Sequence, residues 1–306
     1  MVQKQPRMVE KTAMKIPVLV TGMSGLVGTR VKDLLSGEFD FTDLSLATGV
    51  NIVNFEDVEN KLRESDAKII IHMAAKTDVD ACEDDKILGE DGDAWQINVI
   101  GTNNVVLASE NTGKRLIYIS TDFVFNGTKD FYTENDDPDP LNWYGRTKYE
   151  AEEIVMKSKV ESVILRLAYP YRSYFQERSD FVRRIITKAK DTGEVEGLED
   201  HIFTPTFIDD IAEVLRFVLY RNVSGIYHSV GSLSLPVIEA VNKILSTFGL
   251  EARVKRVIRN EYFLNRAYRP FKLALKNDKI KRLGIEMKRF DDGLLEIKKQ
   301  LTDINI

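Results

Sequence analysis

The chain has 306 residues, which is long enough to bury a sizeable core in one large α/β domain or in a main domain with a smaller companion. Its formal net charge is −5 and it has no long block of Lys and Arg, so nucleic acid is not expected as a partner. The apolar runs are far shorter than the roughly 20 residues of a membrane-spanning helix, so no membrane association is expected.

The numbers of cysteines and histidines indicate the cellular compartment and whether a metal site is expected. Cys82 is the single cysteine, which rules out an intramolecular disulfide and favours a reducing, cytoplasmic location. The three histidines, His72, His201 and His228, are scattered, so no metal site is expected, and His72 is interpreted as a core residue. Residues 1–15 are polar without an apolar segment, so we expect a flexible N-terminal tail rather than a secretory signal.

From residue 16 to residue 167, short apolar runs alternate with amphipathic segments. The runs are apolar along their whole length, which predicts strands covered on both faces: 17–21, 41–46, 68–73, 115–120 and 162–167. The helices expected between them are 26–35, 55–65, 94–111 and 144–158. This alternation predicts an α/β fold with a doubly wound parallel sheet of the Rossmann type.

The rhythm changes after residue 167. An aromatic loop leads to a helix near 181–190, and a strongly periodic helix and the strand-like 225–230 follow. The remainder, from residue 235, reads as helical and basic. We therefore expect a main domain of residues 16–167 and 202–231, and a smaller, mostly helical domain assembled from residues 168–201 and 232–306.

Three glycines follow the first predicted strand, in VTGMSGLVG. Gly22, Gly25 and Gly28 are spaced as GxxGxxG and open the first predicted helix. Glycines allow a tight turn and close backbone approach, and the helix N-terminus then faces a pyrophosphate. The context of strand, turn and helix predicts a dinucleotide site.

The end of the second predicted strand bears on the choice of cofactor. A carboxylate about 20 residues beyond the glycines would bind the ribose 2′-hydroxyl and favour NAD. Here Asp40 and Asp43 come too early, so no carboxylate is expected to repel a 2′-phosphate, and NADP(H) and NAD(H) both remain candidates. Arg30 is either a ligand of that phosphate or a solvated helix residue.

The opposite end of the predicted site carries acid–base groups. Thr121 ends the fourth strand, at the carboxyl edge where doubly wound folds bind ligands. Tyr144 and Lys148 follow at i and i+4 on one helix face, so the ammonium is expected to lower the phenol's pKa. Such a tyrosine exchanges a proton with a carbonyl or alcohol oxygen, and Thr121 supplies a second hydrogen bond. A second YxxxK, Tyr268–Lys272, is interrupted by Pro270 and is not expected to share a helix face.

In this order along the chain, the motifs resemble a known family. They are GMSGLVG, HMAAKTDVDACE, INVIGTNN, ISTDFVFNG, PLNWYGRTKYEAE, LRLAYPY, TPTFIDDIA and RPFKLAL, followed by KIKRLGI. The chain resembles the extended short-chain dehydrogenases/reductases, and within them the dTDP-4-dehydrorhamnose reductases, from about residue 16 to residue 300.

The resemblance assigns the site residues. It implies that Thr121, Tyr144 and Lys148 are catalytic, with Lys148 also holding the nicotinamide ribose. The cofactor-binding residues that it implies are Gly22, Ser24, Gly25, Leu26, Val27, Gly28, Asn51, Ile52, Ala74, Ala75, Thr77, Asn98, Tyr144 and Lys148. The chain departs from the family where an acidic residue is frequent, near Leu46, and where an aspartate becomes Asn51.

The expected substrate-binding residues are Thr121, Asp122, Tyr169 and Arg269. Tyr169 aligns with an aromatic residue, often Trp, that stacks over the sugar. From Arg253 to Gln300 the chain has 15 Lys and Arg against 6 Asp and Glu, a segment that would attract a nucleotide diphosphate, although solvated helix faces explain such charges equally well. Arg269 is the preferred phosphate or sugar contact.

The predicted function is an NAD(P)H-dependent reductase of a nucleotide-linked 4-keto-6-deoxy sugar, of the kind that completes dTDP-L-rhamnose. Two alternatives stay open. One is an epimerase or dehydratase of the same superfamily, although Phe123 follows Asp122 where dehydratases carry further carboxylates. The other is a non-catalytic NADP-binding subunit similar to the regulatory subunit of methionine adenosyltransferase. The partner expected is the nucleotide sugar, with a homodimer left open.

Overall fold

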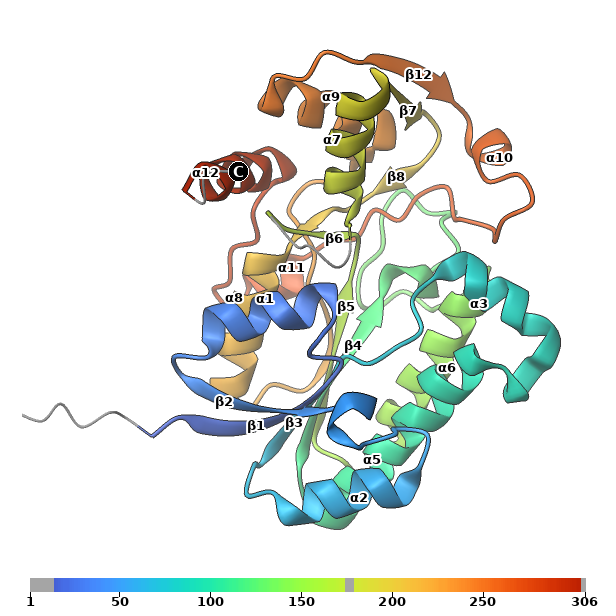
Figure 1. Ribbon diagram of the computed structural model, residues 1–306. Coiled ribbons are helices and arrows are strands. Elements are labelled where there is room, and N and C mark those ends of the chain that lie inside the picture. The colour runs from blue at the N-terminus through green and yellow to red at the C-terminus, as the bar shows by residue number, and fades with distance from the viewer. Residues whose placement is uncertain (1–13, 174–178, 304–306) are drawn as a thin grey trace, which may run out of the picture.

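The computed structural model describes residues 14–173 and 179–303, and its centre is a six-stranded sheet (Figure 1). Residues 1–13 of the expected tail lie outside the described part of the chain. All neighbouring strands of this sheet are parallel, in the order β10-β5-β4-β3-β1-β2. Its strands are β1 (Ile16–Thr21), β2 (Phe39–Leu44), β3 (Ile69–His72), β4 (Arg115–Thr121), β5 (Ser162–Leu167) and β10 (Gly225–His228).

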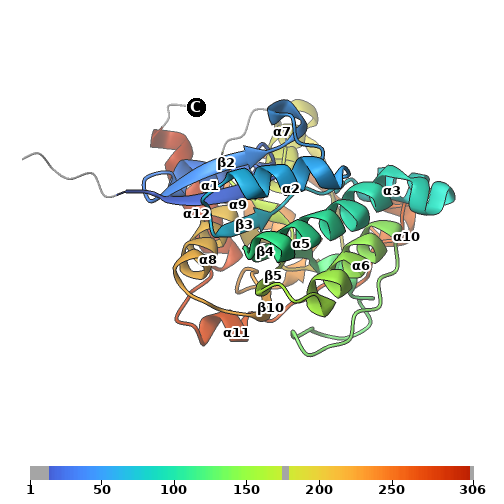
Figure 2. The same ribbon diagram turned by 90° about the horizontal axis from the view of Figure 1, so that it is seen from below.

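Helices cover both faces of the sheet, as Figure 2 shows. Along β1 the side chains alternate: Val18 and Val20 pack with α1 and α8, whereas Leu19 packs with the layer of α2 and α5. This burial on both faces explains the continuous apolar runs, and it confirms the predicted α/β class. The helices of these layers are α1 (Leu26–Leu35), α2 (Phe55–Glu64), α5 (Gly101–Thr112), α6 (Trp143–Lys157) and α8 (Ile208–Tyr220).

The chain order of the strands fixes where a ligand can enter. β1 lies between β2 and β3, so the chain leaves β1 in one direction and later returns to its other side. Ligands of such sheets bind in the crevice outside the carboxyl ends of the strands, at this switch point. His72 ends β3 there as a core residue, with Nδ1 2.6 Å from Thr21 Oγ1 and Nε2 3.0 Å from Thr102 Oγ1.

A second group of elements lies on the side where β4 and β5 end (Figure 1). The sequence predicted a mostly helical region here, but the structure adds three two-stranded sheets, β6–β9, β7–β12 and β8–β11. The strands are β6 (Pro170–Tyr171), β7 (Glu194–Leu198), β8 (Ile202–Phe203), β9 (Thr206–Phe207), β11 (Leu235–Pro236) and β12 (Arg253–Val257). The helices of this group are α7 (Phe181–Thr192), α9 (Val237–Phe248), α10 (Arg259–Tyr262) and α12 (Phe290–Asp303). The short helix α11 (Asp278–Lys281) instead packs against β10, with Ile280 in the core that α8 shares with the central sheet.

Several boundaries differ from the expected ones. β2 is displaced by two residues toward the N-terminus, because Ser45 caps a short 3₁₀ turn, Leu46–Thr48, immediately after it. The helix expected at 94–111 is α4 (Asp93–Trp95), a π turn (Gln96–Ile100) and then α5. A short helix, α3 (Val79–Asp85), was not expected. Within the described ranges, no helix has both the length and the apolar character needed to cross a membrane.

Candidate active site

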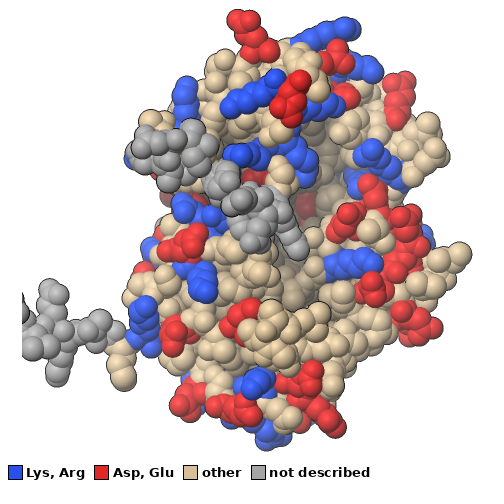
Figure 3. Space-filling model, viewed as in Figure 1, with Lys and Arg blue, Asp and Glu red and all other residues tan. Residues whose placement is uncertain are grey.

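A cavity of about 1260 Å³ lies outside the carboxyl ends of the central strands. Its walls come from the loop before α1, the residues that follow β2, β3, β4 and β5, one face of α6, and parts of α7, β7 and residues 262–269. Figure 3 shows the hollow between the two groups of elements, with Lys and Arg side chains near its rim. The cavity therefore opens where the sheet topology predicts a ligand site.

The glycine loop forms one end of the cavity, as predicted. Gly22 has φ +75°, and a Cβ there would lie 2.6 Å from the backbone nitrogen of Ala74. Only glycine permits both this conformation and this approach. Gly25 is the N-cap of α1 and has no side chain to cap it, so first-turn N–H groups of α1 stay available to an anion. Ser24, Leu26, Val27 and Gly28 also line this end.

The loop after the short 3₁₀ turn brings Asn51 and Ile52 to the wall of the same end. Asn104 of α5 holds this loop, because its side-chain amide donates to the carbonyl oxygens of Ile52 and Val53, both at 2.9 Å. Leu46 lines the cavity and is 76% exposed, so the side chain at this position lies at the solvent edge of the cavity.

Arg30 does not line the cavity. Its Nε and Nη2 donate to the two carboxylate oxygens of Asp209 on α8, each at 2.7 Å. A bidentate pair of this kind satisfies the guanidinium and ties α1 to α8. The structure therefore favours a structural role for Arg30 over the phosphate contact considered from the sequence. Asp43 accepts a hydrogen bond from Ser45 Oγ at 2.7 Å and is not among the lining residues that the structure describes.

The segment after β3 crosses the middle of the cavity, with Ala74, Ala75 and Thr77 on its wall. Asn98 was expected to contact the cofactor, but it is fully buried and does not line the cavity. Its Oδ1 accepts from the backbone N–H of Lys76 at 2.8 Å, and its Nδ2 donates to Thr147 Oγ1 at 2.9 Å. This expectation is corrected: the amide of Asn98 is occupied in fixing the cavity wall to α6.

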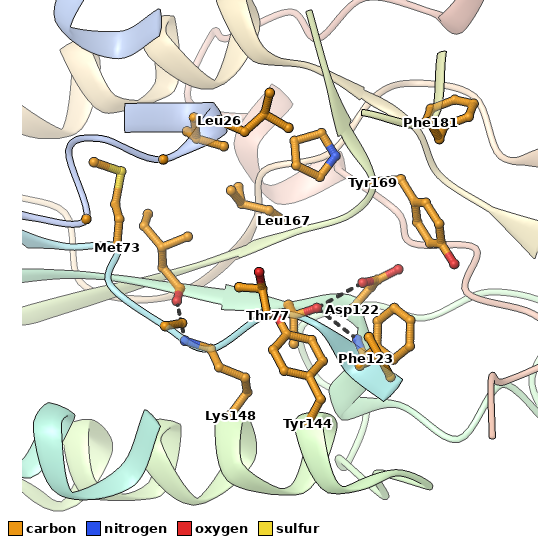
Figure 4. A pocket seen from close by; sticks show the side chains of 18 of the residues that line it. Leu26, Met73, Thr77, Asp122, Phe123, Tyr144, Lys148, Leu167, Tyr169 and Phe181 are labelled. Atoms are coloured by element: carbon orange, nitrogen blue, oxygen red, sulfur yellow. Dashed lines mark hydrogen bonds between the residues drawn. The ribbon is translucent and has the colours of Figure 1, made fainter. Parts of the chain in front are cut away.

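Thr121, Tyr144 and Lys148 all line the cavity, and Figure 4 shows Tyr144 and Lys148 extending from the same helix, α6. Asn142 caps α6 by accepting from the backbone N–H of Gly145 at 2.8 Å. A Cβ on Gly145 would lie 2.2 Å from the carbonyl oxygen of Phe123, so glycine is required for α6 to approach the end of β4 this closely. Lys148 Nζ donates to the carbonyl oxygen of Ile119 on β4 at 2.8 Å and lies over the ring of Tyr118, 4.3 Å from its centroid.

The electrostatics of this side differ from the expectation. Burial raises the pKa of the Tyr144 phenol, and a hydrogen bond with Thr121 opposes only part of that rise. Burial also lowers the pKa of Lys148 to about 7, against the opposing charge of Glu152. The predicted lowering of the phenol's pKa is therefore wrong for this structure, because desolvation raises that pKa and the neighbouring Asp122 raises it further. Tyr144 is a neutral phenol here and is able to donate its proton.

Asp122 directly follows Thr121 and lines the same side. It is 1% exposed, and burial raises its pKa to about 7 although Thr121 Oγ1 donates to its Oδ1 at 3.0 Å. Phe123 then places its ring edge toward Tyr144, with the ring centroids 5.7 Å apart. An apolar ring thus packs directly against the phenol of Tyr144.

Tyr169 faces the cavity opposite Tyr144, at the point where the chain leaves β5. Its backbone is in the left-handed region, with φ 40°, which is unusual for a non-glycine residue. Its hydroxyl donates to His201 Nε2 at 2.9 Å, because Nδ1 of the same ring must donate to the carbonyl oxygen of Pro270, also at 2.9 Å. Burial lowers the pKa of His201 to about 4, which keeps this acceptor neutral. Tyr169 also packs on Phe203, with ring centroids 4.8 Å apart.

Arg269 lines the cavity but is already engaged. Its Nη1 donates to the carboxylate of Asp80 on α3 and to the carbonyl oxygen of Ala267, the latter at 2.7 Å. Its guanidinium also lies over the ring of Phe263, 4.8 Å from the centroid. The guanidinium on which the predicted phosphate or sugar contact depends is thus held in place by a carboxylate.

Comparison with known proteins decides the family. The model of the RmlD substrate binding domain family matches residues 14–302. The chain belongs to this family. Spore coat polysaccharide biosynthesis protein SpsK of Bacillus subtilis is 31% identical over 281 residues, 91% of this chain and 95% of that protein. Methionine adenosyltransferase 2 subunit beta of Mus musculus is 28% identical over 294 residues, 91% of this chain and 86% of that protein.

A solved structure shows the same fold. dTDP-4-dehydrorhamnose reductase from Bacillus anthracis, in complex with NADP, is 30% identical and superposes with a TM-score of 0.86. The superposition covers 94% of this chain and all of that chain. The resemblance drawn from the motifs is thereby confirmed, and so is the Rossmann-type fold.

One wall of the cavity in this RmlD family member was not predicted from the sequence. It consists of side chains from α7, β7 and the residues around them: Phe181, Arg184, Ile185, Lys188, Glu196, Leu198, His201 and Phe203. The amphipathic character of α7 was visible in the sequence, but its apolar face is explained equally well by packing in a core. His201 carried no motif, so the sequence held no signal for its place beside Tyr169.

Proposed function

We propose that this chain is a reductase of a nucleotide-linked 4-keto-6-deoxy sugar, of the dTDP-4-dehydrorhamnose reductase type, and that it uses NADPH. The observation that carries the proposal is the convergence of Thr121, Tyr144 and Lys148 on one cavity wall, with the glycine loop at the other end. The Bacillus anthracis reductase, which shares the fold over nearly its whole length, supports both the activity and the cofactor.

The residues present fit a dinucleotide. The backbone cradle at Gly22, which a Cβ would fill, and the uncapped start of α1 would hold a pyrophosphate. Asn51 and Ile52 would contact the adenosine, and Ala74, Ala75 and Thr77 would line the middle of the cofactor. Lys148 would hold the nicotinamide ribose.

The chemistry divides among three side chains. When bound, the reduced nicotinamide supplies a hydride to C4 of the keto sugar. Tyr144 donates its phenolic proton to the carbonyl oxygen as the C=O π bond breaks, so that the ketone becomes an alcohol. Thr121 donates a second hydrogen bond to that oxygen while negative charge develops on it. Lys148, when protonated, stabilises the phenolate until solvent returns its proton.

We further propose roles at the substrate end and a division of the chain. Tyr169 stacks on the sugar, and Asp122 and Arg269 contact the substrate. Residues 16–167 and 202–231 form the cofactor domain, which is supported by the positions of α8 and β10 within the central layers. At its boundary, β8 and β9 pair with β11 and β6 of the other group. Residues 168–201 and 232–306 form the substrate domain. We also propose a cytoplasmic location and a homodimer.

The experiment is an assay of reduced-cofactor oxidation with NADPH or NADH and a panel of 4-keto nucleotide sugars. We expect net oxidation with at least one of them, together with formation of the 4-hydroxy sugar. An epimerase or dehydratase recycles its cofactor and would show no net oxidation. The similarity to methionine adenosyltransferase 2 subunit beta makes a non-catalytic subunit the second candidate, and cofactor binding without turnover on any keto sugar would favour it.

A further inference from the structure

We propose that Asp122 is a positioning residue for the reduction, because its charge state decides whether the hydroxyl hydrogen of Thr121 points at Asp122 or at the substrate carbonyl. The inference rests on the proposed function. It starts from a conflict in the hydrogen bonds at the end of β4, where one hydroxyl hydrogen faces more than one acceptor.

The hydroxyl of Thr121 has a single hydrogen and two lone pairs. One lone pair accepts from the backbone N–H of Phe123 at 3.3 Å. The hydrogen is directed at Asp122 Oδ1, 3.0 Å away, and the Tyr144 oxygen also lies within hydrogen-bonding reach of Thr121. A substrate carbonyl in the cavity would add a further acceptor, so Thr121 donates to it only after releasing Asp122.

The carboxyl group of Asp122 is placed to control this choice. Its Oδ2 is buried and has no hydrogen-bond partner among the described residues, and Asp122 lines the cavity. An ionised carboxylate only accepts hydrogen bonds, and it accepts them strongly. It therefore retains the Thr121 hydrogen. A neutral carboxyl group is a weaker acceptor and carries a hydrogen of its own, which frees Thr121 to turn toward the substrate.

The surroundings of Asp122 determine the pH at which the Thr121 hydroxyl hydrogen changes its acceptor. The titratable groups that face it are Tyr144 on α6 and Tyr169 after β5, and Cys82 of α3 lies against Tyr144. Lys148 follows one turn beyond Tyr144. Burial raises the pKa of Asp122 to about 7, with the hydrogen bond from Thr121 acting in the opposite direction. The neutral form is thus favoured below about pH 7 and the carboxylate above it.

The first test compares turnover at two pH values. Ketone reduction needs Thr121 as a donor, so the wild-type kcat is expected to fall about three- to tenfold from roughly pH 6 to pH 8 as Asp122 ionises. Lys148 also titrates in this range, so the readout is the ratio of kcat at the two pH values in variants. Asp122→Asn, a neutral residue of similar shape, is expected to lower this ratio, and so is Thr121→Val.

The double variant shows whether Asp122 acts through Thr121. With Thr121→Val in place, Asp122→Asn should leave the pH ratio unchanged. An Asp122→Asn variant that keeps the wild-type ratio would assign the decline to Lys148 and overturn the proposal. An equal effect of Asp122→Asn on the pH ratio with and without Thr121 would show that the carboxylate does not act through Thr121, which overturns the proposal as well.

The second test needs no turnover, so it also decides the matter if the proposed function fails. Infrared difference spectra between wild type and Asp122→Asn follow the protonated carboxyl band of Asp122 as pH changes. The Asp122 pKa is expected near 7 and should rise in Thr121→Val, because Thr121 donates to the ionised form. Thr121→Ser keeps the hydroxyl and should keep the wild-type value. The same pKa in Thr121→Val and wild type would show that Thr121 and Asp122 are not coupled.

Discussion

The two ends of the cavity differ in whether backbone or side-chain groups form their walls. At the glycine loop, the wall is mostly backbone and small or apolar side chains, and its geometry is fixed by close approaches such as Gly22 to Ala74. At the far end, the wall consists of aromatic and charged side chains from α7, β7 and residues 262–269. Backbone recognition suits a cofactor that many enzymes share, whereas side chains on separate segments can change with the substrate.

The largest effects are expected at Tyr144 and Lys148, which lie between the two ends of the cavity. Tyr144→Phe removes only a hydroxyl, so folding and cofactor affinity should survive while kcat falls by roughly 10²–10⁴, the usual contribution of a positioned acid. Lys148→Met should lower both kcat and cofactor affinity, because Lys148 serves the phenol and the ribose. Stopped-flow turnover and cofactor fluorescence measure the two quantities. Full activity of Tyr144→Phe would remove Tyr144 from the mechanism.

The glycine end should tolerate no side chain. In Gly22→Ala, the new Cβ meets the backbone at 2.6 Å and the left-handed φ of +75° is strained. We expect cofactor affinity to fall about 30-fold or more, which corresponds to roughly 2 kcal/mol. Gly37→Ala is the matched control, since a Cβ there has nothing within 4 Å. Equal affinities of the two variants would show that the loop does not cradle the cofactor.

The two ends also differ in how far the sequence predicted them. The glycine spacing and the pair Tyr144 and Lys148 are local patterns in the sequence. Once the strands and helices are assigned, each pattern predicts where its residues lie in the fold. Tyr268–Lys272 shares the spacing but lies outside any helix, as Pro270 predicted. In contrast, Arg269 and Asp80 are 189 residues apart in the sequence, so no local pattern predicts their contact.

The pKa values and hydrogen-bond partners of the site residues could not be predicted from the sequence, because they depend on packing. Nothing in YxxxK states how deeply the pair is buried, and burial reverses the expected direction of the Tyr144 pKa. Asn98 likewise looked like a ligand by its motif, yet its amide is taken up by Lys76 and Thr147. The fold class, by comparison, follows from the alternation of apolar runs with helices. An error of a few residues in the bounds of a strand or helix does not change this alternation.

At the substrate end, Tyr169 should act on sugar binding rather than on the cofactor. Tyr169→Ala removes the ring that faces Tyr144 and should raise KM for the keto sugar about tenfold with cofactor affinity unchanged. Tyr169→Phe keeps the ring and loses only the bond to His201, so its KM should stay near the wild-type value. Steady-state kinetics and melting temperatures separate the cases. An unchanged KM with a lowered melting temperature in Tyr169→Ala would place the ring in the core instead.

The smallest expected effect concerns the choice between the two nicotinamide cofactors at the outer edge of the glycine end. Leu46 is exposed and no carboxylate lines the cavity beside it in the described chain, so nothing there repels a 2′-phosphate. Wild type should therefore bind NADPH at least as well as NADH, as fluorescence titration will measure. A clear NADH preference of wild type would mean that Asp43 reaches the ribose after all.

Leu46→Asp sharpens this prediction by adding the carboxylate that is missing. At an exposed position the repulsion of a phosphate is worth about 1 kcal/mol, so NADPH affinity should fall roughly fivefold while NADH affinity holds. Leu46→Asn is the uncharged control and should change neither affinity, and added salt should weaken the effect of the aspartate because the site is exposed. If Leu46→Asp left the NADPH affinity unchanged at low salt, the 2′-phosphate would lie elsewhere, and the backbone end of the cavity would hold the cofactor in a different register from the one that the glycine loop implies.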